Sequence, residues 1–175
     1  MLHNILTTDR TKLRPSDSFF LDTNVILYLH HPPSTNSNPF IAENYSNFVA
    51  HLMKTGCTLR VSSFNIQEAF HVVETIALND HNRNASLKVK RKAFRRQHRS
   101  RISMEQESLW SQMKNNYTIE NAIIDRTMLE SFIKNYTNNY YDPIDYLFTI
   151  NHPSCNIITT DSDFSSDSSL ALYTL

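Results

Sequence analysis

Short apolar runs alternate along this chain with longer segments whose apolar residues recur at helical spacing. The runs at residues 18–22, 58–61, 157–158 and 170–175 predict strands. The helical spacing predicts helices over residues 40–54, 62–77, 104–114, 119–136 and 142–152, and a short helix after residue 24. Because short strands that alternate with helices form parallel sheets, we expect an α/β protein with three α/β/α layers, a central mostly parallel sheet flanked by helices.

Capping residues mark the ends of several predicted helices. Gly56 follows residues 40–54 and is a natural helix stop. Ser62 or Ser63 precedes the next helix and can cap its first turn. Asp142 and Pro143 indicate a helix start, since Asp caps helices and Pro favours the first helical position.

The chain is expected to form one domain, because 175 residues suffice for a single core. Residues 1–17 are polar and lack a periodic apolar pattern, so we expect a polar N-terminal arm followed by a globular domain over residues 18–175. Residues 31–39 predict a loop from their prolines, serines and asparagines. A basic helical insertion with a thin apolar face is expected at about residues 80–116.

Charge is balanced overall but unevenly distributed. There are 17 basic and 17 acidic residues, and nine of the basic ones, with no acid among them, lie between Arg83 and Arg101. A basic segment on an otherwise acidic chain suggests an anionic partner such as RNA. An equally ordinary interpretation is a solvated helix face or a disordered loop. The candidate RNA-binding residues are Lys88, Lys90, Arg91, Lys92, Arg95, Arg96, Arg99 and Arg101.

Composition excludes several other classes of site. Gly56 is the only glycine, which excludes Gly-rich dinucleotide and P-loop motifs. Cys57 and Cys155 match no zinc spacing, so a reduced cytoplasmic protein is expected. No segment has the apolar length of a signal peptide or a membrane helix, and we expect no membrane partner.

Four acidic residues stand directly after predicted strands or in the first turns of predicted helices: Asp22, Glu68, Asp145 and Asp161. Open α/β sheets place ligand-binding groups at these positions. Carboxylates brought together repel each other unless a cation lies between them, and hard oxygen ligands suit Mg²⁺ or Mn²⁺. Each acid taken alone could equally be a capping, turn or solvated residue.

The segments LDTNVIL, VSSFNIQEAFHVV, DPIDYLFTI and IITTDSDF resemble the successive motifs of PIN-domain ribonucleases, which include the VapC-type toxins. The resemblance covers residues 19–164 except about residues 80–116. It implies a PIN-like fold and metal-dependent cleavage of single-stranded or structured RNA that leaves a 5′-phosphate.

The same resemblance assigns roles to individual residues. It implies that the catalytic and metal-binding acids are Asp22, Glu68, Asp145 and Asp161, with auxiliary roles for Asp163, Thr23 and Asn24. The third acid is open to a second interpretation. Asp145 opens the apolar run and is favoured, whereas Asp142 has the 19-residue spacing to Asp161 that is typical of the family. In the favoured interpretation Asp142 is mainly the helix cap, and Glu74 on the second motif's helix lies on the surface.

We therefore expect a divalent-metal-dependent endoribonuclease, toxin-like or active in RNA processing, in which one or two ions activate a water and bind the scissile phosphate. Two alternatives are a catalytically inactive PIN-like module that binds RNA through the basic segment, and a DNA-directed nuclease of related architecture. Relatives of the VapC type pair with antitoxins and dimerise, so an antitoxin or other protein partner and a homodimer are plausible.

Overall fold

All six strands of the sheet run parallel. The computed structural model describes residues 1–31, 38–135, 148–149, 151–152, 154–166 and 169–175. The strands are β1 (Leu2–Asn4), β2 (Ser18–Leu21), β3 (Thr58–Ser62), β4 (Thr118–Glu120), β5 (Asn156–Ile158) and β6 (Ala171–Thr174). They lie side by side in the order β1-β6-β5-β2-β3-β4.

This order creates a switch point at the centre of the sheet. From β2 the chain continues outward to β3 and then β4, whereas β5 lies on the opposite side of β2 and leads to β6. Because every strand is parallel, all their carboxyl ends meet at one edge. Ligands of open α/β sheets bind outside the carboxyl ends at such a point.

Helices pack on one face of the sheet, and the main hydrophobic core lies between them and the strands. They are α1 (Thr23–His30), α2 (Pro39–Thr55), α3 (Ser63–Asn84) and α5 (Arg99–Asn116). Phe19, Leu21 and Ile158 point to this face, where they pack against fully buried residues such as Phe48 of α2. Alternate side chains of a strand face opposite sides, so Phe20 points the other way.

The second face is covered by residues on either side of β5. Phe148, which is helical, packs there with Phe20, Ile157 and Leu172. Phe164 of the 3₁₀ helix η2 (Asp163–Ser166) belongs to the same cluster. The molecule therefore has the expected α/β/α layers around a parallel sheet.

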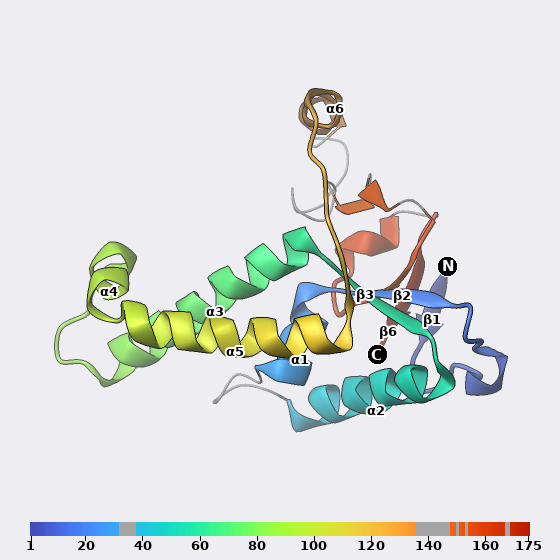
Figure 1. Cartoon of the computed structure of the whole chain (residues 1–175), viewed down its shortest axis with the longest axis horizontal. Coiled ribbons are helices and arrows are strands. Elements are labelled where there is room, and N and C mark those ends of the chain that lie inside the picture. The colour runs from blue at the N-terminus through green and yellow to red at the C-terminus, as the bar shows by residue number, and fades with distance from the viewer. Residues whose placement is uncertain (32–37, 136–147, 150, 153, 167–168) are drawn as a thin grey trace.

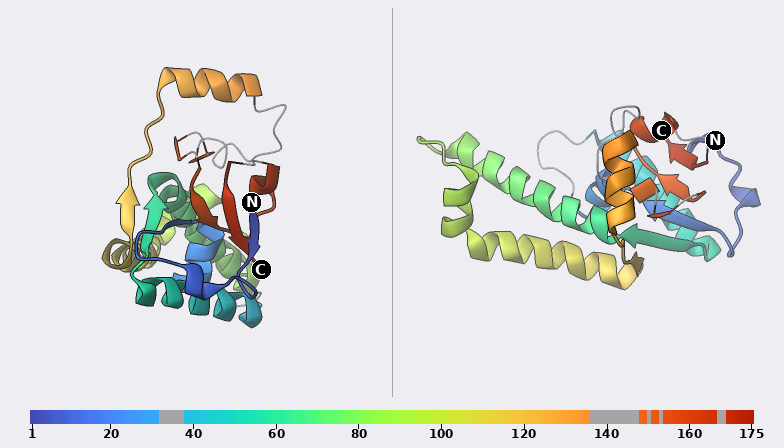
Figure 2. Two further views of the ribbon diagram at one scale, coloured as in Figure 1. Left: turned by 90° about the vertical axis from the view of Figure 1, so that its right-hand side faces the viewer. Right: turned by 90° about the horizontal axis from the view of Figure 1, so that it is seen from above.

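A long helical hairpin extends from the sheet (Figures 1 and 2). It consists of α3 and α5, which pack together, and the short helix α4 (Arg91–Gln97) lies at its far end. Ala77, Phe94 and Ile102 form a small separate core at that end. This core explains how a strongly basic segment with few apolar residues still folds as helices.

Most predicted boundaries are confirmed. The Asp22 side chain caps α1, and Ser62 rather than Ser63 caps α3. Gly56 ends α2 in the left-handed conformation with φ 85°, where its amide donates to the carbonyl oxygens of Leu52 and Met53. Of the helix expected over residues 142–152, the structure describes residues 148, 149 and 151, which are helical, and His152, which forms a bend.

The expectation of an irregular arm over residues 1–17 is wrong for its first part. Residues Leu2–Asn4 form β1, which pairs in parallel with β6 at the edge of the sheet. Ile5 is fully buried in the main core. A second short 3₁₀ helix, η1 (Arg10–Lys12), lies between β1 and β2. A strand of three residues with a mostly exposed pattern carries no periodic signal.

The helix expected over residues 119–136 begins later than predicted. Residues Thr118–Glu120 form β4, which pairs with β3, and α6 covers only Arg126–Asn135. The Arg60 guanidinium donates to the Glu120 carboxylate across this strand pair at 2.6 Å. The free edge of β3 therefore converts the start of the predicted helix into a strand, and α6 lies apart from the sheet (Figures 1 and 2).

Among the described residues, no helix is both long enough and apolar enough to cross a membrane.

Candidate active site

Asp22 stands at the switch point of the sheet. It follows β2 directly, and its side chain is only 4% exposed. One carboxylate oxygen, Oδ1, accepts the backbone N–H of Thr23 at 2.6 Å, and the other, Oδ2, accepts the Thr159 hydroxyl at 2.8 Å. Both oxygens are therefore held in fixed directions, and each keeps a lone pair for a further ligand.

Asp161 is joined to Asp22 through Thr159. Thr159 follows β5, the strand beside β2, and is fully buried. Its hydroxyl donates to Asp22 and accepts the backbone N–H of Asp161 at 2.8 Å. Asp161 in turn accepts the backbone N–H of Asp163, the first residue of η2, at 2.8 Å. The loop after β5 is therefore locked next to the end of β2.

Glu68 is joined to the same point from the other side. It lies on α3, which follows β3, the other neighbour of β2. The Thr23 hydroxyl donates to the Glu68 carboxylate and accepts the side-chain amide of Asn65 at 3.2 Å. Thr23 thus connects the Glu68 carboxylate with the Asp22 carboxylate, whereas Thr159 connects Asp22 with the backbone of Asp161.

The electrostatics agree with this geometry. Burial raises the pKa of Asp22 to about 7, against an opposing hydrogen bond from Thr159, and the charges of Glu68 and Asp161 raise it further. Within the described part of the chain, no lysine or arginine forms an ion pair with Asp22. The acids at this sheet edge therefore repel each other, and a cation between them would stabilise their ionised forms.

The remaining predicted site residues lie either outside the described residues or near the ends of α1 and η2. Asp142 and Asp145 lie outside the described residues. Asp163 is half-buried at the start of η2, and Asn24 is exposed on α1. The described part of the chain contains no group of three or more His, Cys, Asp or Glu residues arranged to hold a metal ion. The donor set of Asp22, Glu68 and Asp161 is nevertheless all carboxylate oxygen, which suits Mg²⁺ or Mn²⁺.

Two supporting residues were missed by reasoning from the sequence. Thr159 and Asn65 are almost completely buried polar residues that orient Asp22 and Thr23. Thr159 stands two residues before Asp161 in the final motif, and Asn65 lies three before Glu68. Polar residues directly after a predicted buried strand, as Thr159 is, were the available signal.

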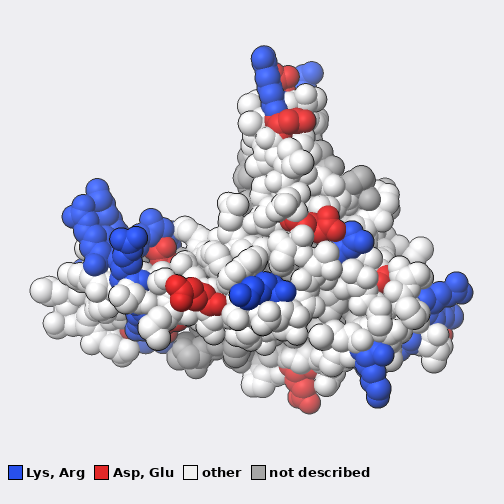
Figure 3. Space-filling view, viewed as in Figure 1, with Lys and Arg blue, Asp and Glu red and all other residues white. Residues whose placement is uncertain are grey.

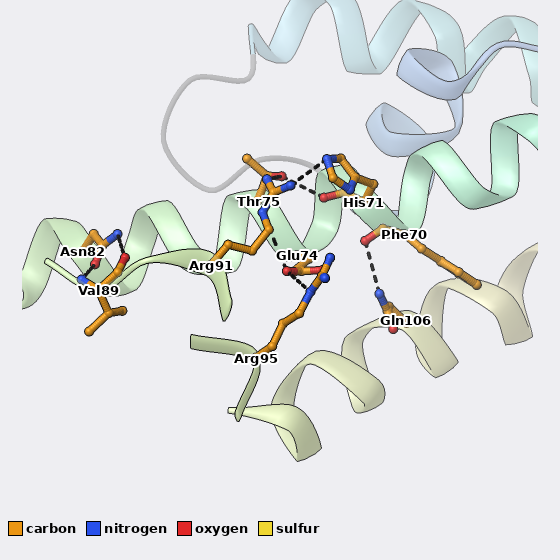
Figure 4. Close-up of polar contacts among 9 residues, drawn as sticks. All are labelled: Phe70, His71, Glu74, Thr75, Asn82, Val89, Arg91, Arg95 and Gln106. Atoms are coloured by element: carbon orange, nitrogen blue, oxygen red, sulfur yellow. Dashed lines mark hydrogen bonds and ion pairs between the residues drawn. The ribbon is translucent and has the colours of Figure 1, made fainter. Parts of the chain in front are cut away.

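The basic segment is only partly available to a ligand. Glu74 is 4% exposed, so the expectation that it lies on the surface is wrong. Its carboxylate forms ion pairs with Arg95 at 2.6 Å and Arg91 at 3.7 Å (Figure 4). Arg101 pairs with Glu105 at 2.9 Å. Arg91 and Arg95 therefore join α4 to α3, and the charge of Arg101 is paired within α5.

The other cations of the segment are exposed. Lys88, Lys90, Lys92, Arg96 and Arg99 are exposed residues for which no ion pair is found among the described residues. Figure 3 shows Lys and Arg side chains gathered at the α4 end of the hairpin. These five residues are therefore the part of the predicted set whose charge is accessible.

Comparison with known proteins supports the fold. No protein-family model and no curated protein sequence matches this chain. A crystal structure of VapBC2 from Rickettsia felis, bound to a DNA fragment from its promoter, is similar over 89% of this chain and 96% of that chain, with a TM-score of 0.52 and 15% sequence identity. The architecture is therefore PIN-like.

Proposed function

We propose that this protein is a divalent-metal-dependent endoribonuclease with its active site at the carboxyl ends of β2 and β5 and the start of α3. The observation that carries the proposal is the buried Asp22 carboxylate, whose pKa is raised to about 7 and which is joined through Thr23 and Thr159 to two further acids. Burying an acid among acids is costly, and active sites are where proteins accept that cost.

Asp22, Glu68 and Asp161 would hold the metal, and we propose that Asp145, or Asp142 in its place, completes the set. A bound divalent ion supplies a water of lowered pKa and stabilises charge on the phosphate. Thr159 and Thr23 keep the Asp22 carboxylate in one orientation, so that no reorientation is needed when the substrate binds. Burial of Asp22 keeps bulk water away from its oxygens. Asp163 and Asn24 have auxiliary roles in this proposal.

The proposal is tested by measuring RNA cleavage with Mg²⁺ or Mn²⁺, and with EDTA, for the natural protein and for Asp22→Asn. We expect metal-dependent cleavage that falls at least about 100-fold in the variant, since a ligand and its charge are lost. Asp9→Asn is the matched control, because Asp9 is a half-exposed residue that caps η1, away from this sheet edge. It should cleave like the natural protein.

Equal cleavage by Asp22→Asn and the natural protein would remove this active site from consideration. Binding of RNA without any cleavage would favour the inactive RNA-binding module. Cleavage of DNA but not RNA would favour the DNA-directed nuclease. Because a single pair of substrates is compared under the same conditions, the assay separates all three functions.

We also propose that the chain forms a complex with a small protein partner of the antitoxin kind, or a homodimer. The similar Rickettsia felis structure is a VapBC2 complex bound to promoter DNA, which supports a partner of this kind. Sedimentation of the purified chain alone tests the homodimer. A chain that sediments as a monomer would count against the homodimer.

A further inference from the structure

A pocket of about 490 Å³ lies between α3, α5 and β4, beside the proposed active site along α3. Its wall is formed by Phe70 of α3, Trp110 of α5 and Ile119 of β4, which are half-buried and pack against the main core. These side chains are held by the core on one side and present aromatic and apolar surface to the pocket on the other.

The polar part of the pocket rim is rich in amide side chains. Three amide side chains, Gln67, Gln106 and Asn121, line it. Gln106 donates one N–H to the backbone carbonyl of Phe70 at 3.2 Å, whereas the side chains of Gln67 and Asn121 form no hydrogen bond with any described residue. Amides offer a donor and an acceptor side by side, which matches the edges of nucleobases.

A second pocket, of about 660 Å³, adjoins the first and shares Ser103 and Gln106 with it. It is lined by Arg95, Arg96 and Arg99. Glu74 neutralises Arg95, as Figure 4 shows, so the accessible positive charge comes from Arg96 and Arg99. An aromatic, amide-rimmed pocket is thus continuous with a cationic one along the same hairpin.

We propose that these two pockets together bind single-stranded RNA, with one unstacked base against Trp110 and the adjoining phosphates at Arg96 and Arg99. This inference rests on the proposed ribonuclease function and assigns it a substrate-binding surface outside the acidic site. Unpaired bases stack on aromatic side chains and hydrogen-bond along their edges, whereas bases in a duplex are already stacked and paired. The surface therefore selects single strands.

Glu107 is the one acid among the described residues that line the first pocket, and it disfavours a phosphate there. Glu107 lies on its rim and accepts the Ser103 hydroxyl at 2.9 Å. Its negative charge disfavours phosphate there and can accept a base amino group. The phosphates are then directed toward the arginines of the second pocket, where Glu74 is the one acid among the described lining residues and is neutralised.

Trp110 is the only tryptophan of the chain, so its fluorescence reports directly on this pocket. The experiment titrates the full-length protein, in EDTA to stop cleavage, with single-stranded RNA of about 12 nucleotides. We expect quenching of Trp110 on binding. Because Trp110→Leu lacks this fluorophore, its affinity is measured from the anisotropy of dye-labelled RNA, as is that of the natural protein. It should be about tenfold weaker, since the variant keeps an apolar contact with the core but loses the stacking surface. The same RNA annealed into a duplex should not quench.

The proposed phosphate contacts of Arg96 and Arg99 are tested by measuring how the RNA affinity depends on salt concentration. Arg96→Gln with Arg99→Gln should reduce the slope of log affinity against log salt by about 1.4, or about 0.7 for each lost phosphate contact. Lys12→Gln with Lys54→Gln is the matched control, since both lysines are exposed on η1 and α2, away from the hairpin. The control should leave the slope unchanged.

A second variant of the pocket keeps the test valid if Trp110→Leu does not fold. Asn121→Glu adds a charge at an exposed rim position and should also weaken RNA binding. Unquenched fluorescence, or unchanged affinity in both pocket variants, would overturn the inference. So would a change of oligomeric state in Asn121→Glu with unchanged RNA affinity, since the pocket would then be a protein interface. Binding is measured in EDTA and cleavage in a separate assay with metal. RNA binding without cleavage would therefore contradict the ribonuclease proposal alone, and cleavage with unchanged binding in both pocket variants would contradict this inference alone.

Discussion

At the scale of single residues, Asp22 combines two roles that usually belong to different side chains. It caps α1 through the Thr23 amide, and it is the buried acid at the centre of the proposed active site. A capping carboxylate normally has a lowered pKa because it accepts hydrogen bonds. Here burial outweighs those bonds and raises the pKa to about 7.

This raised pKa predicts an unusual dependence of stability on pH. Between the ordinary Asp value of 3.8 and about 7, the folded state holds a proton that the unfolded state has released. The free energy of unfolding should therefore fall as pH rises through this interval, by up to about 4 kcal/mol from this group in the absence of divalent ions. Urea denaturation at pH 5 and pH 8, in EDTA, should show about 3 kcal/mol of this fall, because only the part of the interval above pH 5 is sampled.

Asp22→Asn should remove most of this slope, because an amide does not titrate. Added Mg²⁺ or Mn²⁺ should reduce it in the natural protein but not in the variant, since a metal stabilises the ionised carboxylates of the folded state. An identical slope in the variant would show that Asp22 has an ordinary pKa.

At the scale of elements, Glu74 links α3 to the short helix α4 at the end of the hairpin. It lies buried on α3 and pairs with Arg91 and Arg95 of α4, beside the small core formed around Phe94. Both arginines are partly exposed and could be solvated without it. The cost of losing the carboxylate should therefore be below that of breaking a fully buried ion pair.

We predict that Glu74→Gln destabilises the protein by about 1–2 kcal/mol and increases amide hydrogen exchange in α4 more than in α2. Glu107→Gln is the matched control, because Glu107 is exposed on α5 and forms no ion pair with a described residue. Equal exchange of α4 in the natural protein and in Glu74→Gln would mean that the small core alone holds this helix.

The elements also show where sequence patterns mislead. Residues 119–136 have helical spacing, yet Thr118–Glu120 form a strand because β3 offers a free edge to pair with. For a short apolar run, the sequence does not separate the two states, and the neighbouring strand decides. In the hairpin, by contrast, the predicted helices are present. Its few apolar residues, including Phe94 and Ile102, predicted helices correctly because they meet in one cluster.

At the scale of the whole molecule, the N-terminal residues complete the sheet. β1 pairs with β6, the last strand of the chain, and Ile5 is fully buried in the main core. The beginning and the end of the described chain are therefore neighbours in space, and the fold depends on both.

We predict that Ile5→Ala lowers the free energy of unfolding by about 2–5 kcal/mol, as expected for a large side chain removed from a core. Leu6→Ala is the matched control, since Leu6 is 50% exposed, and it should cost less than about 1 kcal/mol. Urea denaturation of the two variants measures the difference. Equal stabilities would show that the segment before β2 is an independent arm.

The sequence by itself determined the parallel α/β class, most helix boundaries, and the positions of Asp22 and Asp161 after strands and of Glu68 on the helix that follows β3. These features are local, because strand and helix periodicity, caps and turns depend on residues a few positions apart. Tertiary structure alone decided that β1 and β4 are edge strands and that Glu74 is buried under two arginines. It also decided that Thr159 and Thr23 connect the three acids. Each of these depends on partners from distant parts of the chain, whose pairing is set by the order of strands in the sheet.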